Sequence, residues 1–252
     1  MTDETGAAEP AGAEAPSAKP AGAEAPSGPA GARLVLATVR PQTYGTGSPA
    51  RVRDPIVEPL WTGIRALAAV DAAGAALVDE LGDALEAMEI VLDALVAAAR
   101  ADGLVVDGFI TKQATRGGTG VYMWSDEMPS VGSLMGLRRN RAADTVKLKE
   151  GALEATTFTA DDELSFVATD LLWLDGTSLL DVPLLERRRQ LEGVLEESDV
   201  VRLGAFVRPP IETWVGSWRS QGFGGITYKA ANSRYLPGVA NPDWVLTGMP
   251  RR

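Results

Sequence analysis

Few side chains in this sequence are able to do chemistry, because its 252 residues include no histidine and no cysteine. The usual base at neutral pH and the commonest metal ligand are therefore missing, and neither a disulfide nor a thiolate metal site can form. Mechanisms based on Ser-His-Asp, Cys-His or histidine-bound metal are excluded. The chemistry that remains uses carboxylates, arginine, hydroxyls, a bound magnesium ion, or one of five lysines. These lysines are Lys19, Lys112, Lys147, Lys149 and Lys229.

Charged residues also occur within three of the mainly apolar stretches. Arg65 lies in the stretch from residue 57 to 70, Asp107 in residues 103–110, and Lys229 in residues 222–229. A structural role would pair Arg65 with a carboxylate, either Glu58 or Asp107, and leave Lys229 as a solvated strand residue. A functional role would turn these groups toward a ligand. Both interpretations stay open at the level of sequence.

Composition predicts one folded domain and a tail. Residues 1–31 contain Pro-Ala-Gly-Ala-Glu-Ala-Pro-Ser twice and no bulky apolar cluster, so we expect a disordered acidic tail. Residues 32–252 supply enough of the 45% hydrophobic content for a core. No apolar run approaches the roughly 20 residues that span a bilayer, and no signal sequence is apparent, which predicts a cytoplasmic protein without a membrane span.

The formal net charge of -10 argues against binding nucleic acid by global electrostatics. One basic cluster, within residues 138–149, is expected to be a solvated surface more readily than a phosphate contact. We therefore expect weak or no DNA binding by the chain alone.

Hydrophobic periodicity predicts alternating strands and helices along the chain. Residues 34–39 are expected to form a strand, residues 41–52 a loop, and residues 57–70 a loop followed by a strand that turns at 72–74 into its antiparallel partner at 75–78. Helices are predicted at 83–99, 182–197 and 212–221, and further strands at 103–110, 164–174, 200–207 and 222–229. Residues 111–160 show no clean period.

Several of these stretches are similar to motifs of ATP-dependent DNA ligases. The family has a strand-edge motif Glu-x-Lys-Trp-Asp-Gly-x-Arg-Ala, and this chain retains Glu58, Trp61, Gly63, Arg65 and Ala66 of it. Further matches, in the same order, are the run 166–176, the segment 183–191 and the run 221–238, followed by Asp243-Trp244. Over most of residues 54–246 the sequence therefore resembles the nucleotidyltransferase (adenylation) domain of these ligases, especially the bacterial repair type.

The resemblance implies an α+β fold of two mainly antiparallel sheets flanked by helices, as in DNA ligases and mRNA capping enzymes. It further implies that the oligonucleotide-binding (OB) domain that follows in the ligases is absent from this chain. The family's chemistry is attack by a lysine on the α-phosphorus of ATP with magnesium present.

In this chain the positions that serve that chemistry carry other residues. Leu60 stands at the lysine position and Thr62 at the aspartate position of the same motif. Phe109 stands where the family has a glutamate at the ribose and metal end of the site, and Thr169 stands where an aromatic residue stacks on adenine. Gly224 replaces a second metal-binding carboxylate, and Leu246 lies in the segment that holds phosphates in the family. The residues that remain as a vestigial nucleotide site are Arg65, Asp107, Lys229 and Arg234. Leu60 and Phe109 are expected to fill the space that ATP would occupy.

These substitutions lead to the hypothesis of a non-catalytic pseudoenzyme of the ligase family, a scaffold or binding module for a protein partner, with DNA repair as its setting. No catalytic residue, metal site or cofactor is then expected. Two alternatives stay open. One is an active nucleotidyltransferase or ligase that uses ATP, magnesium and a relocated lysine, with Lys112 and Lys229 as candidates, and the other is a nucleotide sensor that binds without reacting.

Overall fold

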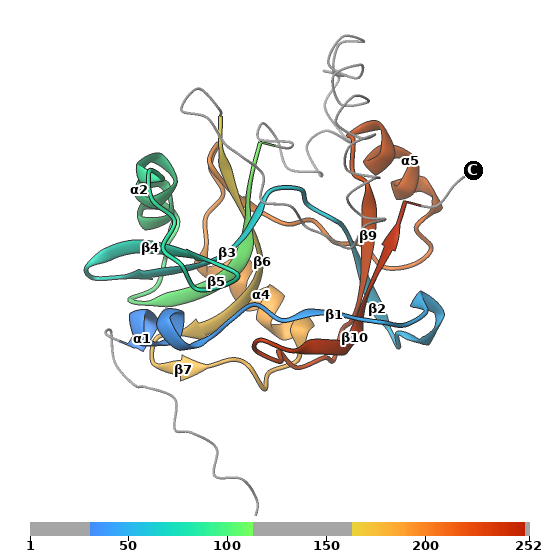
Figure 1. The fold of residues 1–252 in the computed structure, drawn as a ribbon, viewed down its shortest axis with the longest axis horizontal. Coiled ribbons are helices and arrows are strands. Elements are labelled where there is room, and N and C mark those ends of the chain that lie inside the picture. The colour runs from blue at the N-terminus through green and yellow to red at the C-terminus, as the bar shows by residue number, and fades with distance from the viewer. Residues whose placement is uncertain (1–30, 113–162, 250–252) are drawn as a thin grey trace, which may run out of the picture.

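The computed structural model of the chain describes residues 31–112 and 163–249. In this part of the chain two β-sheets stand side by side, each with its own helices (Figure 1). The predicted α+β architecture of mainly antiparallel sheets is confirmed. The predicted tail up to residue 30, the aperiodic stretch 113–160 and the basic cluster 138–149 lie outside the described residues.

The larger sheet is built on strands from the middle of the chain, in the order β4-β3-β5-β6-β7, and β8 pairs with β6. Its antiparallel strands are β3 (Ile64–Asp71), β4 (Gly74–Asp79), β5 (Leu104–Thr111), β6 (Ser165–Leu174) and β7 (Thr177–Ser178). The short β8 (Val201–Leu203) runs parallel to β6. The hairpin between β3 and β4 forms as predicted, with Asp71 opposite Gly74.

The smaller sheet joins the two ends of the described chain, in the order β1-β10-β9-β2. Its strands are β1 (Thr43–Gly45), β2 (Pro55–Pro59), β9 (Gly225–Ala230) and β10 (Ala240–Gly248). β1 runs parallel to β10, and β2 and β10 are both antiparallel to β9. The segment from Leu60 to Gly63 leads directly from β2 of the smaller sheet to β3 of the larger one.

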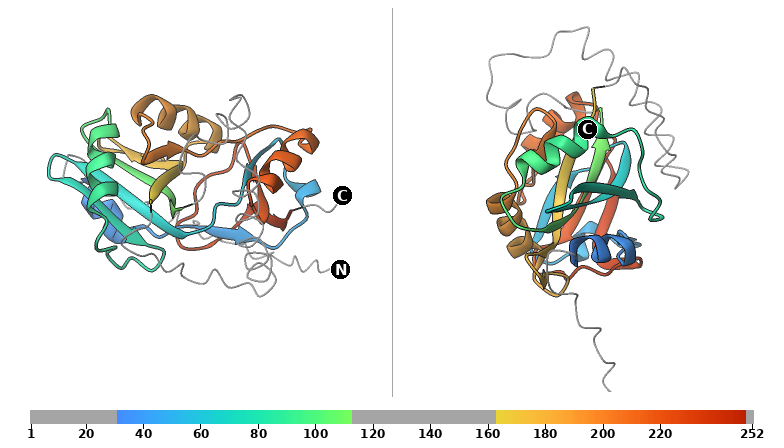
Figure 2. Two further views of the ribbon diagram at one scale, coloured as in Figure 1. Left: turned by 90° about the horizontal axis from the view of Figure 1, so that it is seen from above. Right: turned by 90° about the vertical axis from the view of Figure 1, so that its left-hand side faces the viewer.

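The helices cover the sheets from different sides (Figures 1 and 2). They are α1 (Gly31–Thr38), α2 (Glu89–Ala98), α4 (Leu184–Val194) and α5 (Glu212–Ser220), with a short 3-10 helix η1 (Pro49–Arg51). α2 and α5 lie at opposite ends of the molecule in Figure 1, beside the larger and the smaller sheet respectively. Among the described residues, no helix has the length and apolarity that crossing a bilayer requires.

The core follows from alternation along the central strands. Ala66, Ala68 and Val70 of β3 face a cluster shared with α2 and α4, whereas Leu67 and Ala69 face a second cluster with α1 and the smaller sheet. A third cluster joins α5 and the smaller sheet to β5 and β6. The large sheet is therefore buried on both faces, which explains why its strands read as continuous apolar runs.

One predicted strand is wrong. Residues 34–38 of this predicted strand belong to helix α1. The buried positions Ala32, Val35 and Leu36 recur at helical spacing, while Leu34 is 52% exposed. A short apolar run alone did not distinguish the two periods.

Other predicted boundaries shift. The predicted loop 41–52 contains β1 and η1, and residues 57–59 belong to strand β2. The helices predicted at 83–99 and 182–197 are shorter, α2 beginning at Glu89 and α4 ending at Val194, and the strand predicted at 200–207 is limited to β8. The helix predicted at 212–221 agrees with α5.

Candidate functional site

The predicted site residues Arg65 and Asp107 meet between the two central strands of the larger sheet. β3 and β5 are neighbours, and Arg65 donates from Nε to Asp107 Oδ1 at 3.1 Å and from Nη2 to Oδ2 at 2.6 Å. The two side chains are 8% and 1% exposed. Of the two partners considered for Arg65, Asp107 is the one observed, and the pairing is the bidentate geometry in which arginine binds a carboxylate most strongly.

Two residues in the segments next to the smaller sheet, Gln42 before β1 and Tyr235 between β9 and β10, complete this pair. Arg65 Nη1 donates to the backbone oxygen of Gln42, and the Tyr235 hydroxyl donates to Asp107 Oδ2 at 2.7 Å. Burial, reinforced by the negative charge of Asp107, raises the pKa of Tyr235 well above its usual range. Burial opposes the charge on Arg65, but Asp107 outweighs it and raises the pKa of the guanidinium. Arg65 therefore stays charged and Tyr235 stays protonated.

Lys229 forms a second buried ion pair, with Glu58. The strands β2 and β9 are antiparallel neighbours, and Lys229 Nζ lies 2.5 Å from Glu58 Oε2, with both side chains 3% exposed. The ammonium also lies 4.2 Å from the centroid of the Trp244 ring, a cation–π contact. The expectation that Lys229 is a solvated strand residue is thus wrong, because β9 is covered here by β2 and by Trp244.

Two arginines on helix α4 extend the charged network. Arg187 binds Asp170 through two hydrogen bonds of 2.8 and 2.7 Å, and it reaches the Ser233 carbonyl at 3.2 Å. Arg188 donates to the carbonyls of Thr169 and Gly204 and lies 3.9 Å from Glu58 Oε1. Helix α4, strand β6 and the segment after β9 are held together by these contacts.

Sequence reasoning did not assign a role to Arg187, Arg188 or Asp170. A signal was present, because Leu184 and Leu191 are buried and the arginines between them fall on the same side of the helix. Fully buried arginines need anionic or carbonyl partners, so a buried carboxylate near α4 was foreseeable.

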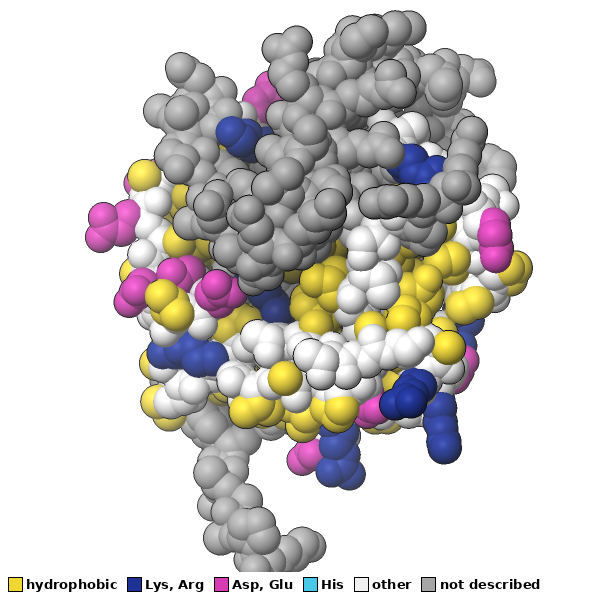
Figure 3. Space-filling view, turned by 45° about the vertical axis from the view of Figure 1, so that its right-hand side comes forward, with side chains coloured by type: hydrophobic (Ala, Val, Ile, Leu, Met, Phe, Trp, Pro, Cys, Tyr) yellow, Lys and Arg dark blue, Asp and Glu magenta, His cyan; other side chains and the backbone are white. Residues whose placement is uncertain are grey.

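The positions at which the family's reactive groups were expected hold apolar or small residues. Leu60 is 4% and Phe109 6% exposed, and Phe109 packs in the third core cluster with Trp61 and Val167. Thr169 donates its hydroxyl to the Asp107 carbonyl at 3.2 Å. On the face of the molecule that Figure 3 draws, hydrophobic side chains gather near the centre.

The remaining predicted positions lie apart from the buried ion pairs, and two of them take part in backbone pairing. Arg234 is exposed and pairs with Asp181 at 3.4 Å on the surface. Gly224 accepts a backbone hydrogen bond from Met249, and Leu246 pairs with Thr227 in the β9–β10 ladder. Thr62 lies half-buried in the segment between β2 and β3.

Comparison with known proteins agrees with this architecture. Residues 135–245 match the model of the ATP dependent DNA ligase domain. DNA ligase 1 of Korarchaeum cryptofilum is 35% identical over 78 residues, which are 30% of this chain and 14% of that ligase. The DNA ligase of Thermococcus fumicolans is 35% identical over 80 residues, again 30% of this chain and 14% of the ligase. In residues 135–245 and in these shorter matches, the chain is therefore similar to ATP-dependent DNA ligases.

The chain also has the fold of solved ligases. It superposes on the ligase domain from M. tuberculosis LigD with a TM-score of 0.55 and 19% identity, over 83% of this chain and 59% of that one. A mycobacterial DNA ligase D complexed with ATP and MES gives a TM-score of 0.55 with 22% identity, over 82% and 59% of the two chains. The chain spans about one-seventh of the curated ligases that it matches.

Proposed function

We propose that this adenylation domain has lost its adenylation chemistry and acts as a non-catalytic scaffold or protein-binding module. DNA repair is the setting that its relationship to DNA ligases suggests. The observation that carries the proposal is the buried ion pair of Lys229 with Glu58, since Lys229 is the one buried lysine among the described residues.

A lysine that attacks phosphorus must present a free amine in line with the leaving group. The ammonium of Lys229 is instead held between Glu58 and the Trp244 ring, both buried. Leu60, at the family's lysine position, has no nucleophilic atom and is buried as well. Lys112 follows the end of β5 and is exposed at the edge of the described residues.

The described residues also fit ATP and magnesium poorly. A triphosphate and its metal need cations and carboxylates that are free to turn toward the ligand. Here Arg65 neutralises Asp107 and Lys229 neutralises Glu58, so the two pairs have no net charge to offer. Over residues 31–112 and 163–249 no three acidic groups gather closely enough to hold a metal ion. These features support a cleft filled by its own side chains, including Leu60 and Phe109.

Incubation with labelled ATP and magnesium tests the loss of chemistry. We expect no AMP adduct that survives denaturation, either on the wild type or on the Leu60→Lys, Thr62→Asp variant, in which Phe109 and Gly224 remain. An adduct on the wild type would overturn the proposal, and its loss in Lys112→Met or Lys229→Met would assign the relocated lysine. An adduct on the variant alone would show that the cleft still accepts ATP.

A thermal-shift measurement tests the sensor alternative. A ligand that binds the native state raises the melting temperature. Because the proposed cleft does not bind ATP, we expect about 1 mM ATP to leave the melting temperature unchanged. A rise that disappears in Lys229→Met, but not in the surface control Arg189→Met, would establish nucleotide binding and contradict a cleft closed to ligands.

A further inference from the structure

The end of the molecule that carries α2 is strongly acidic. Residues 79–102 contain seven acidic residues and one basic residue, a net charge of -6 out of the chain's -10. The exposed carboxylates Glu86, Glu89 and Asp93 form no ion pair with another described residue. On the left flank of Figure 3, acidic side chains stand among hydrophobic ones.

The same segment exposes aliphatic side chains. Ile90 is 75%, Leu81 73% and Val96 46% exposed, and these are three of the five large hydrophobic residues that are exposed in the described chain. Val91 and Leu95 already supply the inner face of α2 to the core, so Ile90 and Val96 are not needed for its packing. The helix therefore has an outer face of its own, made of Glu89, Ile90, Asp93 and Val96.

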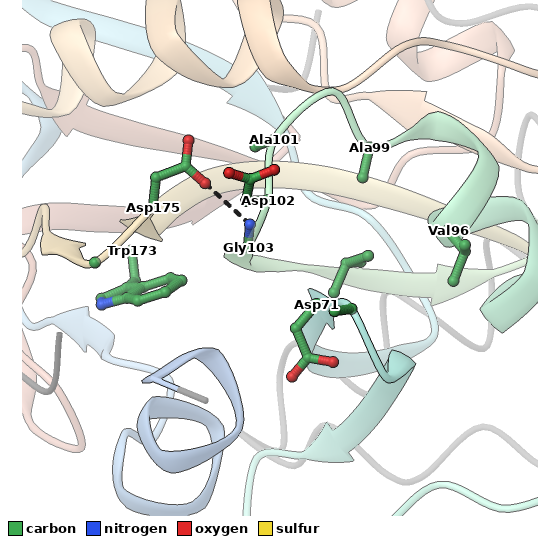
Figure 4. Close-up of a pocket in the computed structure, with 11 residues that line it drawn as sticks. Asp71, Val96, Ala99, Ala101, Asp102, Gly103, Trp173 and Asp175 are labelled. Atoms are coloured by element: carbon green, nitrogen blue, oxygen red, sulfur yellow. Dashed lines mark hydrogen bonds between the residues drawn. The ribbon is translucent and has the colours of Figure 1, made fainter. Parts of the chain in front are cut away.

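A pocket of about 520 Å³ adjoins this face, in the size range of ligand-binding sites. Val96 and Ala99 contribute one wall, Val70 and the buried Trp173 contribute apolar surface, and three aspartates stand around it. Figure 4 shows Asp102 and Asp175 on one side of the pocket and Asp71 on the other.

The three carboxylates of the pocket are not equally neutralised. Asp71 is bound by Arg33 at 3.1 Å and by the backbone of Ala73, whereas Asp175 accepts, from the described residues, only the Gly103 amide at 2.9 Å. Asp102 is exposed and forms no ion pair with a described residue. Asp102 and Asp175 are brought together by Gly103, so their like charges repel each other unless a cation lies between them.

We propose that the outer face of α2 and the adjoining pocket bind a basic, amphipathic segment of a partner protein. A lysine or arginine of that segment enters the pocket beside Asp102 and Asp175, and an aliphatic side chain covers Ile90 and Val96. This combination of charge and apolar surface matches the way an amphipathic segment lies in a groove. The inference deepens the scaffold role proposed above by giving its partner a chemistry and a place.

Other occupants fit less well. DNA is repelled by a surface of net charge -6, and a second copy of the chain would bring the same acidic face against it. A divalent metal ion needs several oxygen ligands at close range, and no group of three acidic side chains in the described residues has that spacing. A basic peptide satisfies the charges without needing such geometry.

Fluorescence anisotropy with a labelled synthetic peptide of alternating leucine and lysine pairs is the test. We expect the full-length protein to bind it, to bind the matching glutamate peptide much more weakly, and to lose affinity between about 50 and 500 mM salt. Ile90→Ser and Asp102→Asn are expected to weaken binding about fivefold each. The matched controls Val239→Ser and Asp243→Asn, exposed at positions away from α2, are expected to leave it within about twofold.

Three outcomes would overturn this inference. Equal losses in the α2 variants and in their controls would mean that the peptide responds to net charge alone. Self-association in sedimentation that Ile90→Ser abolishes would make a second copy the occupant, and calcium stabilisation lost in Asp102→Asn without peptide binding would make it a metal ion. None of these measurements uses ATP. The absence of peptide binding would therefore leave the result of the AMP-adduct experiment unchanged.

Discussion

At the scale of single residues, the centre of the domain is a set of buried ion pairs. Glu58 with Lys229, Asp107 with Arg65 and Asp170 with Arg187 all lie in surroundings nearly closed to solvent. In such surroundings, removing one partner leaves a charge without compensation, and this costs far more than the pair itself contributes.

We therefore expect Glu58→Leu and Lys229→Met each to lower the free energy of unfolding by about 3 kcal/mol. The double variant should recover part of this loss, because it removes both charges of the pair, although Arg188 loses the Glu58 carboxylate 3.9 Å away. Urea unfolding of the four proteins, as a double-mutant cycle, gives the coupling energy.

The surface pair of Arg234 and Asp181 is the control for this cycle. Its side chains are 69% and 88% exposed, so its removal should change stability by less than about 1 kcal/mol. Equal effects at the two pairs, or a double variant as unstable as the sum of the singles, would show that Glu58 and Lys229 do not depend on each other.

The resemblance to DNA ligase motifs pointed to Arg65, Asp107 and Lys229 as the remainder of a nucleotide site. Sequence reasoning predicted one correct partner for Arg65 and none for Lys229. Pairing of Lys229 with Glu58 depends on the register between β2 and β9, which lie about 170 residues apart in the chain, and periodicity within one strand contains no information on register.

At the scale of elements, the connection between β2 and β3 decides how the two sheets are placed. Gly63 in this connection has φ of 135°, and a Cβ on it would lie 2.0 Å from the Ile110 carbonyl oxygen. Both the backbone conformation and the space exclude a side chain.

Gly63→Ala is expected to lower the free energy of unfolding by about 2–4 kcal/mol, because β3 must move away from β5 to admit the methyl group. The control is Gly216→Ala in helix α5, where nothing lies within 4 Å of the new Cβ and a gain of about 0.5–1 kcal/mol is expected. Thermal or urea unfolding of both variants measures the difference, and a Gly63→Ala protein as stable as the wild type would contradict the geometry.

Most elements were predictable because their periods are clear, as in the hairpin of β3 and β4, strand β6 and helix α5. Helix α1 was not, since the apolar run 34–39 alternates poorly by either period and the helix begins earlier, at Gly31, with Gly31 and Ala32 on its buried face. The three-residue strand β1 exists only through its partner β10, a tertiary contact that local sequence does not encode.

At the scale of the whole molecule, the acidic surface governs encounters with other macromolecules. With a net charge of -10, the protein should bind a nicked DNA duplex no more tightly than about 10⁻⁴ M at about 150 mM salt. A gel-shift or anisotropy titration measures this. Tighter binding with a steep salt dependence would contradict the prediction and direct attention to the basic residues 138–149.

The smaller sheet brings together strands from both ends of the described chain, since β1 lies beside β10 and β2 beside β9. During synthesis on the ribosome, β3, β4 and β5 emerge early and are able to pair at once, whereas β2 has to wait for about 165 further residues before β9 appears. Until then the Glu58 carboxylate has no lysine to meet. The nascent polypeptide therefore exposes the edge of β2 for most of its translation, and a chaperone or a partner present at that stage would encounter a different surface from the one on the finished protein.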